Sequence, residues 1–421
     1  MYSDYDHPSE DVFKKISALA QTEQIGHPID PQEVIINDVD IQGGSAIGEN
    51  FTSVLKRFTI HSTVKDANQA YVHKVVGKFL PLNASTTKWW KSMRVFDREA
   101  LMYNQILINY ENESKTSFAP RLYHSSDSCI LLEDLSSSGY VLNDARKGLN
   151  LPQMQAILLK LGSFHAYGHH LIQSMGFERF HSKFGVISDV AHHGPALTKD
   201  PKVTLEFRAI FKGMVKLSLK LLESEYDAQV YQDLCEIMAK VEEDYGAVRK
   251  PLDHHFQVIG HGDLWNNNVL FQTDQTDPLV IADVKFIDFQ NSMRTRPTMD
   301  LVHLFYQSTT PDLRKDHLNA LLKLYHSELL LNLEMRGISP RVYPEEQFHQ
   351  DFKNCFIHGL YMGFVNIQAI FNAEEVINKV VLEKENDPIG PSLTLKAKEV
   401  MLQRLTGLVK EAQEFEVIRF K

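Results

Sequence analysis

The sequence contains few cysteines. Cys129, Cys235 and Cys355 are the three cysteines of a 421-residue chain, and they are odd in number and far apart. This usage favours reduced thiols over a disulfide framework or a zinc site. Adjacent histidines occur at His169 and at two later points of the chain, but no pair has a third ligand at a recognisable spacing. We therefore expect no structural metal.

Long apolar runs are also missing. The longest candidate, residues 359–371, is interrupted by Asn366 and Gln368 and is shorter than the ~20 residues that a membrane helix needs. The first ten residues are polar and acidic, without the apolar segment of a secretory signal. We expect no membrane span, no secretory leader and a cytoplasmic location.

Basic charge is in deficit. The chain has 44 Lys and Arg against 54 Asp and Glu, a formal net charge of -10, and its pI is about 6.0. Proteins that bind nucleic acid normally carry a basic face. This composition argues against a nucleic-acid partner.

No internal repeat, low-complexity segment or linker rich in Gly, Ser or Pro divides the chain, so its domains should be contiguous lobes. The pattern is mostly strand-like from residue 34 to about 132, and one long helix over about 88–108 interrupts it. We predict a small β-rich N-terminal lobe over residues 1–135. The remainder, residues 136–421, should be a large helical lobe.

The second part of the chain is mainly helical in its pattern. Pro152 suits the first turn of a helix whose apolar stripe continues to His165. A small group of strands should interrupt the helices near residues 256–287. Further helices are predicted over residues 204–222, 228–248, 312–336, 346–373 and 393–415.

Within that group of strands, the run from His261 to Asn268 reads HGDLWNNN, and Asp288 ends an apolar strand shortly afterwards. Either fragment alone is common, since an aspartate in a turn is usually a cap. Together, a first Asp, an Asn five residues later and an Asp at a strand end are what phosphoryl transfer from ATP requires. The chain therefore reads as a kinase, in which residues 1–135 would form the nucleotide-binding lobe and residues 136–421 the catalytic and acceptor-binding lobe.

Each residue of this pattern has an expected role. Asp263 is the candidate catalytic base for a substrate hydroxyl, and Asn268 and Asp288 are candidate oxygen ligands of Mg²⁺. His261 should pack and hydrogen-bond within the loop. Asn266 and its neighbour are alternatives to Asn268, and the register of the motif favours Asn268.

A kinase also requires a cation for the nucleotide phosphates and an acid that holds the cation. Lys78, late in its predicted strand, and Glu99, in the long helix, are the candidates. Lys74 lies on the same strand face and is the alternative. An ion pair between Lys78 and Glu99 would confirm the strand register, whereas a pair from Lys74 would shift it by four residues.

Two weaker candidates concern the nucleotide. Asn50 and Ser53 lie in the turn GENFTS, which could cover the phosphates and could equally be an ordinary hairpin turn. Glu133 and Leu135 lie where an apolar strand passes into a polar turn, as in an adenine-binding hinge and as in many strand ends. Asp300 is expected to be the N-cap of a helix and to brace the catalytic loop.

Taken together, these segments resemble the ecdysteroid-kinase-like family, within the aminoglycoside and choline phosphotransferase branch of the protein-kinase-like fold. The resemblance implies an α+β bilobal protein-kinase-like fold, ATP and Mg²⁺ as cofactors, and a small hydroxylated acceptor such as an ecdysteroid or another lipophilic alcohol. Gln290, where protein kinases have Gly, is the form found in the small-molecule kinases. The segments are GENFTSVLKR, GKFLP, FDREALMY, LLEDL, LGSFHA, HGDLWNNNVLF, IDFQ and RPTMDL.

Three other interpretations stay open at this point. A choline or ethanolamine kinase-like activity would need an aromatic and acidic cage for an ammonium group. A catalytically inactive steroid-binding pseudokinase is disfavoured by the presence of Asp263, Asn268 and Asp288. A metal hydrolase built on His261 and Asp263 lacks further histidines nearby in the sequence.

Overall fold

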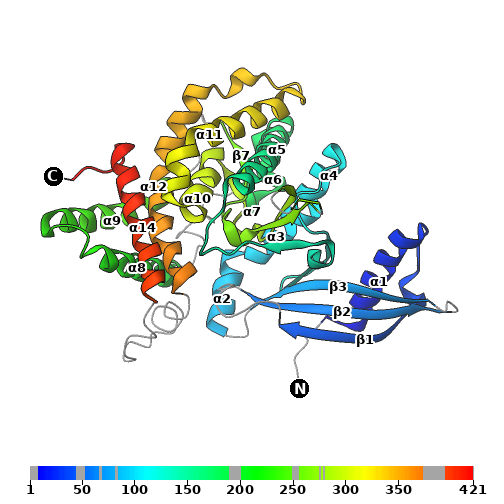
Figure 1. Ribbon diagram of the computed structural model, residues 1–421. Coiled ribbons are helices and arrows are strands. Elements are labelled where there is room, and N and C mark those ends of the chain that lie inside the picture. Colours follow the sequence, from blue (N-terminus) through cyan, green and yellow to red (C-terminus); the bar gives the residue numbers. More distant parts are fainter. Residues whose placement is uncertain are drawn as a thin grey trace. The chain divides into compact units, whose positions relative to one another are not determined.

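The computed structural model describes residues 8–43, 53–65, 69–80, 84–188, 201–248, 256–274, 276–277, 280–372 and 394–420. The chain divides into two compact units, Met1–Val141 and Leu142–Lys421. The first unit contains an antiparallel sheet and the second is mainly helical (Figure 1). The expected α+β class, with a β-rich first part and a helical second part, is confirmed.

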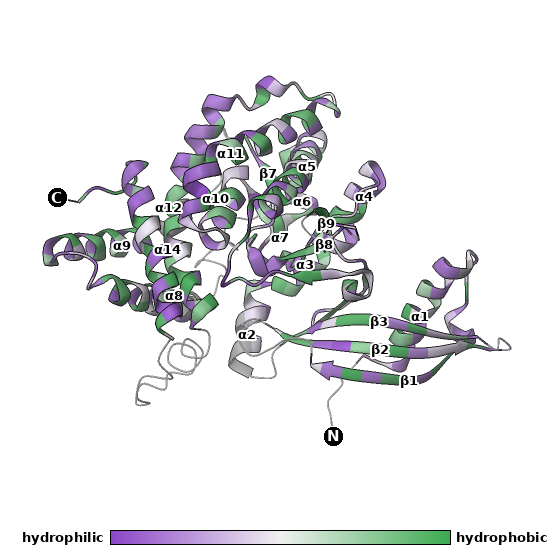
Figure 2. Cartoon of the chain, viewed as in Figure 1, coloured by the Kyte–Doolittle hydropathy of each residue, from purple (hydrophilic) through white to green (hydrophobic). Residues whose placement is uncertain are grey.

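The sheet of the first unit has five antiparallel strands in the order β1-β2-β3-β5-β4. Hydrophobic and hydrophilic residues alternate along β1 to β3 (Figure 2), as expected for strands with one buried face. The strands are β1 (Val34–Gly43), β2 (Val54–Val64), β3 (Ala70–Phe79), β4 (Leu122–Ser125) and β5 (Cys129–Glu133).

Helix α1 (Glu10–Ile25), which the sequence pattern does not predict, lies along this sheet (Figure 1). Its Phe13 and Ile16 are buried, and Phe13 contacts the ring of Phe58 on β2. The helix ends at Gly26, whose left-handed backbone (φ 84°) few other residues adopt without cost. The core of the unit comprises Phe13, Ile16, Phe58, Ile60, Val75, Phe79 and Leu131.

The prediction of a single long helix over residues 88–108 is wrong in one respect. Arg94 adopts a left-handed backbone (φ 54°), which ends α2 (Ala84–Met93) before α3 (Val95–Leu101) begins. A right-handed helix cannot continue through such a residue. After α3 the chain stays helical through a π-helical turn, Met102–Leu107, into α4 (Ile108–Ser114). The strand β6 (Tyr140–Leu142) reaches the division between the units.

The second unit is built on packed helices. Helix α5 packs against α11, and α10 packs against α12. The predicted helices are confirmed with shifts of at most a few residues at their ends, and Pro152 lies in the first turn of α5. The helices are α5 (Leu151–Met175), α6 (Phe177–Lys183), α7 (Gly185–Ser188), α8 (Pro201–Leu222), α9 (Ala228–Val248), α10 (Pro297–Ser308), α11 (Pro311–Glu334), α12 (Glu345–Phe371) and α14 (Leu395–Glu414).

Four short strands position the candidate loop inside this unit. Strands β8 (Val269–Thr273) and β9 (Ile281–Phe286) form an antiparallel hairpin. Strand β7 (Val258–Gly260) pairs with β10 (Met293–Thr295), so the segments before and after the hairpin are joined. The small group of strands predicted near residues 256–287 is therefore confirmed.

The described part of the chain bears on two expectations from the sequence, which concern a membrane span and the state of the cysteines. No helix among these residues is both long enough and apolar enough to cross a membrane. The cysteines Cys129, Cys235 and Cys355 are free thiols. His169, which begins one of the histidine pairs, bonds to the carbonyl of Gln257 and stacks on Phe256, so its role is structural.

Candidate active site

The loop that carries Asp263 leaves β7 at Gly260 and enters β8 through a 3-10 turn, Asn266–Asn268. Gly262 has a left-handed backbone (φ 80°), and a Cβ at this position would overlap the carbonyl oxygen of Asn291. Glycine thus lets the loop approach the segment after Asp288 closely. This contact brings the two sequence motifs together.

Asp300 braces the loop from the first turn of α10. Its Oδ2 accepts the backbone N–H of His261 at 2.6 Å and its Oδ1 accepts that of Gly262 at 2.8 Å. The expected brace is therefore confirmed. The expected N-cap is wrong, because Arg296 occupies that position and Asp300 is already inside the helix.

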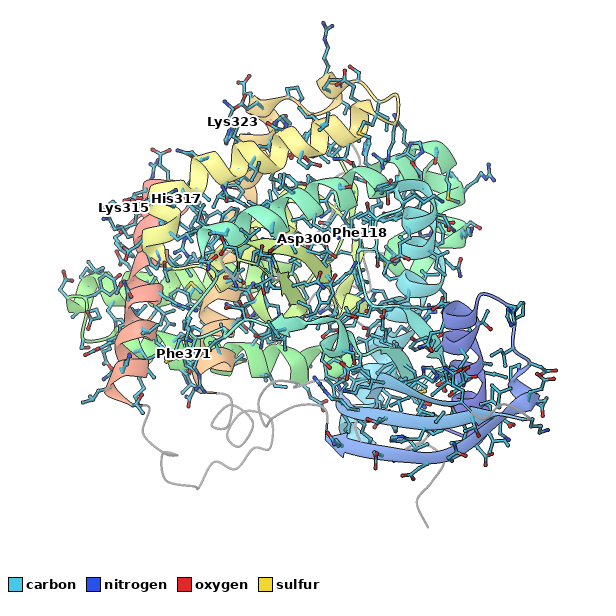
Figure 3. All side chains as sticks on the ribbon, turned by 45° about the vertical axis from the view of Figure 1, so that its right-hand side comes forward. Phe118, Asp300, Lys315, His317, Lys323 and Phe371 are labelled. Carbon is cyan, nitrogen blue, oxygen red and sulfur yellow. The ribbon has the colours of Figure 1, made fainter. Side chains whose placement is uncertain are left out.

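The buried side chains of His165 and Tyr325 form a chain of hydrogen bonds that ends at Asp300. His165 on α5 donates through Nε2 to Asp300 Oδ2 at 3.0 Å, and its Nδ1 lies 2.6 Å from the hydroxyl of Tyr325 on α11. Burial alone would raise the pKa of the Asp300 carboxyl, but the His165 hydrogen bond and charge, with His261 and Gly262, hold it below its usual value. Figure 3 shows Asp300 in the interior of the unit, whereas Lys315 and Lys323 lie on the exposed side of α11.

Asp263 itself is partly accessible, with 22% of its side chain exposed. Its Oδ1 accepts from His303 Nε2 at 3.0 Å, and its Oδ2 accepts from Asn291 Nδ2 at 3.3 Å. Burial would raise the pKa of this carboxyl, but the His303 hydrogen bond and charge, helped by His261 and Asn291, outweigh it and lower the pKa. A carboxylate held in this way is ionised and fixed in orientation at neutral pH.

His261 has the structural role that we expected. Its ring is buried, contacts Phe289 at 4.8 Å between centroids, and bonds through Nε2 to the carbonyl of Ile287 at 2.9 Å. Burial lowers the pKa of this imidazole, against the opposing charges of Asp300 and Asp263. The ring therefore ties the loop to the strand end that carries Asp288.

Asn268 and Asp288 lie at the same end of the β8–β9 hairpin. The N–H of Ile287 donates to the carbonyl of Asn268 at 3.0 Å, directly before Asp288. The side-chain Nδ2 of Asn268 donates to the carbonyl of Asp263 at 2.8 Å, so its Oδ1 is the candidate ligand atom. Asn266, the alternative in the sequence, is instead committed to Asn143.

Asp288 has a left-handed backbone (φ 66°, ψ 60°), which is uncommon outside glycine and clusters at functional sites. Its Oδ2 accepts from Gln290 Nε2 at 3.3 Å, so the glutamine in the DFQ motif helps to orient the carboxylate. A carboxylate and an amide oxygen suit Mg²⁺, which takes one or two protein oxygens and completes its shell with water and substrate phosphates. These two residues fit the ion on this chemistry.

In the first unit, Lys78 on β3 and Glu99 on α3 form an ion pair, with Nζ and Oε2 2.6 Å apart. Both side chains are almost fully buried. Lys74 is exposed on the same strand. The predicted pair and strand register are confirmed, and the proposed contact of Lys78 with nucleotide phosphates stays a prediction.

The remaining nucleotide candidates also belong to the first unit. Asn50 lies outside the described residues. The hydroxyl of Ser53, just before β2, is buried and has no hydrogen-bond partner among the described residues. Glu133 ends β5, and buried Leu135 begins a 3-10 turn after Asp134 caps it. Their expected contacts with ATP stay predictions.

The metal-hydrolase alternative gains no support from the described residues, which contain no group of three or more His, Cys, Asp or Glu side chains arranged to hold a metal. The functional neighbours that sequence reasoning missed are His303, Asn291 and His165. His303 carried a usable signal, because it follows Asp300 by three residues on one helix and therefore lies on the same face. The contacts of Asn291 and His165 depend on packing between distant segments.

The chain is similar to one family of proteins and to solved structures. The model of the ecdysteroid kinase-like family matches residues 47–338. The solved structures include a choline/ethanolamine kinase family protein from Mesorhizobium loti, which is 10% identical, covers 90% of each chain and has a TM-score of 0.38. Among curated proteins, none matches the sequence.

Proposed function

Because the chain belongs to the ecdysteroid kinase-like family, we propose that it transfers the γ-phosphoryl group of ATP to a hydroxyl of a small lipophilic acceptor. Membership of this family supports a small-molecule kinase-like function. The acceptor class is an ecdysteroid or a xenobiotic alcohol. The single observation that carries this proposal is the arrangement around Asp263. The carboxylate of Asp263 is partly exposed and oriented. The backbone carbonyl of the same residue accepts a hydrogen bond from Asn268, which lies at the hairpin end that also carries Asp288.

The proposed chemistry follows from these groups. The acceptor hydroxyl gives its proton to Asp263, its oxygen bonds to the γ-phosphorus, and the bond to the β-phosphate oxygen breaks to release ADP. Asn268 and Asp288 would hold Mg²⁺, which supplies positive charge to the phosphates. Lys78, held by Glu99, would contribute a second positive charge from the first unit.

The choice of acceptor defines the first experiment. We expect purified protein to consume ATP in the presence of Mg²⁺ and at least one hydroxylated steroid or phenolic glycoside, and to leave choline and ethanolamine unchanged. Mass spectrometry should find the acceptor heavier by one phosphoryl group. Ready phosphorylation of choline alone would favour the choline-kinase alternative, and steroid binding without turnover on any acceptor would favour the pseudokinase.

The role of Lys78 gives a second prediction. We expect Lys78→Met to weaken ATP binding about 10- to 100-fold, because a charge-assisted bond contributes about 1.5–3 kcal/mol. Calorimetric titration with a nonhydrolysable ATP analogue and Mg²⁺ measures this effect. The matched control is Lys74→Met, four residues earlier on the same strand and exposed.

Removal of Lys78 alone leaves the buried carboxylate of Glu99 without its partner, which can destabilise the fold by itself. The double variant Lys78→Met/Glu99→Leu replaces the pair by apolar side chains and keeps the test valid. Unchanged ATP affinity in this folded double variant would remove Lys78 from the nucleotide site.

A further inference from the structure

A chain of hydrogen bonds leads from Asp263 through two buried histidines on neighbouring helices. His303 on α10 contacts Asp263 Oδ1 through Nε2 at 3.0 Å, and its Nδ1 lies 3.2 Å from Nε2 of His358 on α12. The two imidazole rings are stacked, with centroids 5.4 Å apart and planes 24° apart. Each histidine is only 2% exposed.

The chemistry of these groups gives the chain a direction. An ionised carboxylate can only accept, so the proton of His303 is on Nε2. A neutral imidazole has one N–H, and Nδ1 of His303 is then an acceptor. With a neutral His303, His358 therefore donates from Nε2.

We propose that His303 is the positioning residue of Asp263 and that His358 fixes the tautomer in which His303 can do so. The bond from His303 holds Oδ1, and Oδ2, whose bond to Asn291 is longer at 3.3 Å, is the oxygen that receives the acceptor proton. This inference rests on the proposed kinase function. It adds two residues that lie outside the HGD and DFQ motifs.

Helix packing explains why the two histidines can reach each other. Gly359, next to His358, lies directly against α10, and a Cβ there would be 2.6 Å from the Tyr306 ring and 3.1 Å from the Val302 carbonyl. The absence of a side chain lets α12 approach α10 at this level. Two rigid helices therefore hold the histidines, which is how a preorganised site keeps its geometry.

Paired Gln and Asn substitutions distinguish a positioning role of His303 from a role in packing alone. Gln places its amide nitrogen near Nε2 of the histidine that it replaces, and Asn places its amide group near Nδ1. We expect His303→Gln, which can still donate to Asp263, to keep kcat within about threefold of wild type. His303→Asn should lower kcat about 10- to 100-fold, because a base displaced by about 1 Å loses alignment. KM for ATP should stay unchanged in both.

His358 provides an independent pair. His358→Gln should leave kcat near wild type, whereas His358→Asn should lower it about 3- to 10-fold, since the proton on His303 is no longer fixed. A structural role alone predicts that Gln and Asn variants at each position lose the same fraction of kcat and of thermal stability. Equal kcat losses for Gln and Asn at position 303 would overturn the proposal.

A spectroscopic measurement tests the hydrogen bonds without any turnover. In protein labelled with ¹⁵N-histidine, the resonance assigned to His303 by its loss in His303→Gln should show a protonated Nε2 and an unprotonated Nδ1 at neutral pH. A protonated Nδ1 would overturn the proposed chain. If wild type phosphorylates no acceptor, the proposed function fails, while this measurement still decides the direction of the hydrogen bonds.

Discussion

Asp263→Asn is expected to slow phosphoryl transfer by roughly 10²- to 10⁴-fold and to leave ATP affinity nearly unchanged. The amide is isosteric and its oxygen can still accept the bond from His303, so the loop should keep its shape. It cannot accept the proton of the acceptor hydroxyl at neutral pH. Binding and chemistry should therefore separate in this variant.

Single-turnover phosphorylation and equilibrium binding of an ATP analogue measure the two effects. Asp316→Asn is the matched control, because it makes the same chemical change at an exposed site on α11. Transfer at the wild-type rate in Asp263→Asn would show that the HGD segment is only a turn.

The pH dependence of the transfer rate follows from the carboxyl of Asp263. The pKa of Asp263 is lowered in the folded protein, so its ionised form persists to a pH below the ordinary aspartate range near 4. Its contribution to the transfer rate should therefore be constant from about pH 8 down to that range and be lost on further acidification.

Asp288→Asn should abolish Mg²⁺-dependent turnover, with a loss of at least about 10³-fold, because an amide contributes no negative charge to a bound metal. The fold should survive, since Asn tolerates the left-handed backbone (φ 66°) that Asp288 adopts. Asn268→Ala should reduce turnover less, because it removes a neutral ligand.

Turnover measured over a range of Mg²⁺ concentrations, together with the melting temperature, tests this prediction. Asp277→Asn is the control, since Asp277 is exposed between the same two hairpin strands. If Asp288→Asn is folded and retains Mg²⁺-dependent turnover near wild type, Asp288 is not a metal ligand.

Local patterns in the sequence determined most elements of the fold. The helix predicted over residues 228–248 has those bounds in the structure, because its apolar residues recur with helical periodicity. The strands on either side of the HGD loop followed from short apolar runs between polar turns. Lys78 and Glu99 were paired correctly, and Lys78 was preferred to Lys74 because it lies late in the predicted strand.

Some local features of the fold were not predicted from these patterns. The break at Arg94 depends on one left-handed residue in an otherwise helical pattern, and no glycine or proline marks it. Helix α1 was missed because its first residues are polar and its apolar face becomes apparent where Phe13 packs against Phe58. Asp300 was taken for an N-cap, but the helix had already begun at Pro297.

The sequence by itself determined which residues could perform phosphoryl transfer, because the residue types and spacings of HGDLWNNN and DFQ are local. Tertiary structure alone decided what holds them. Asp263 bonds to His303, 40 residues away, and Asp300 to His165, 135 residues away. Such contacts are fixed by how α5, α10 and α12 pack, and helix packing depends on the fit of side chains from the whole unit, which no local pattern encodes.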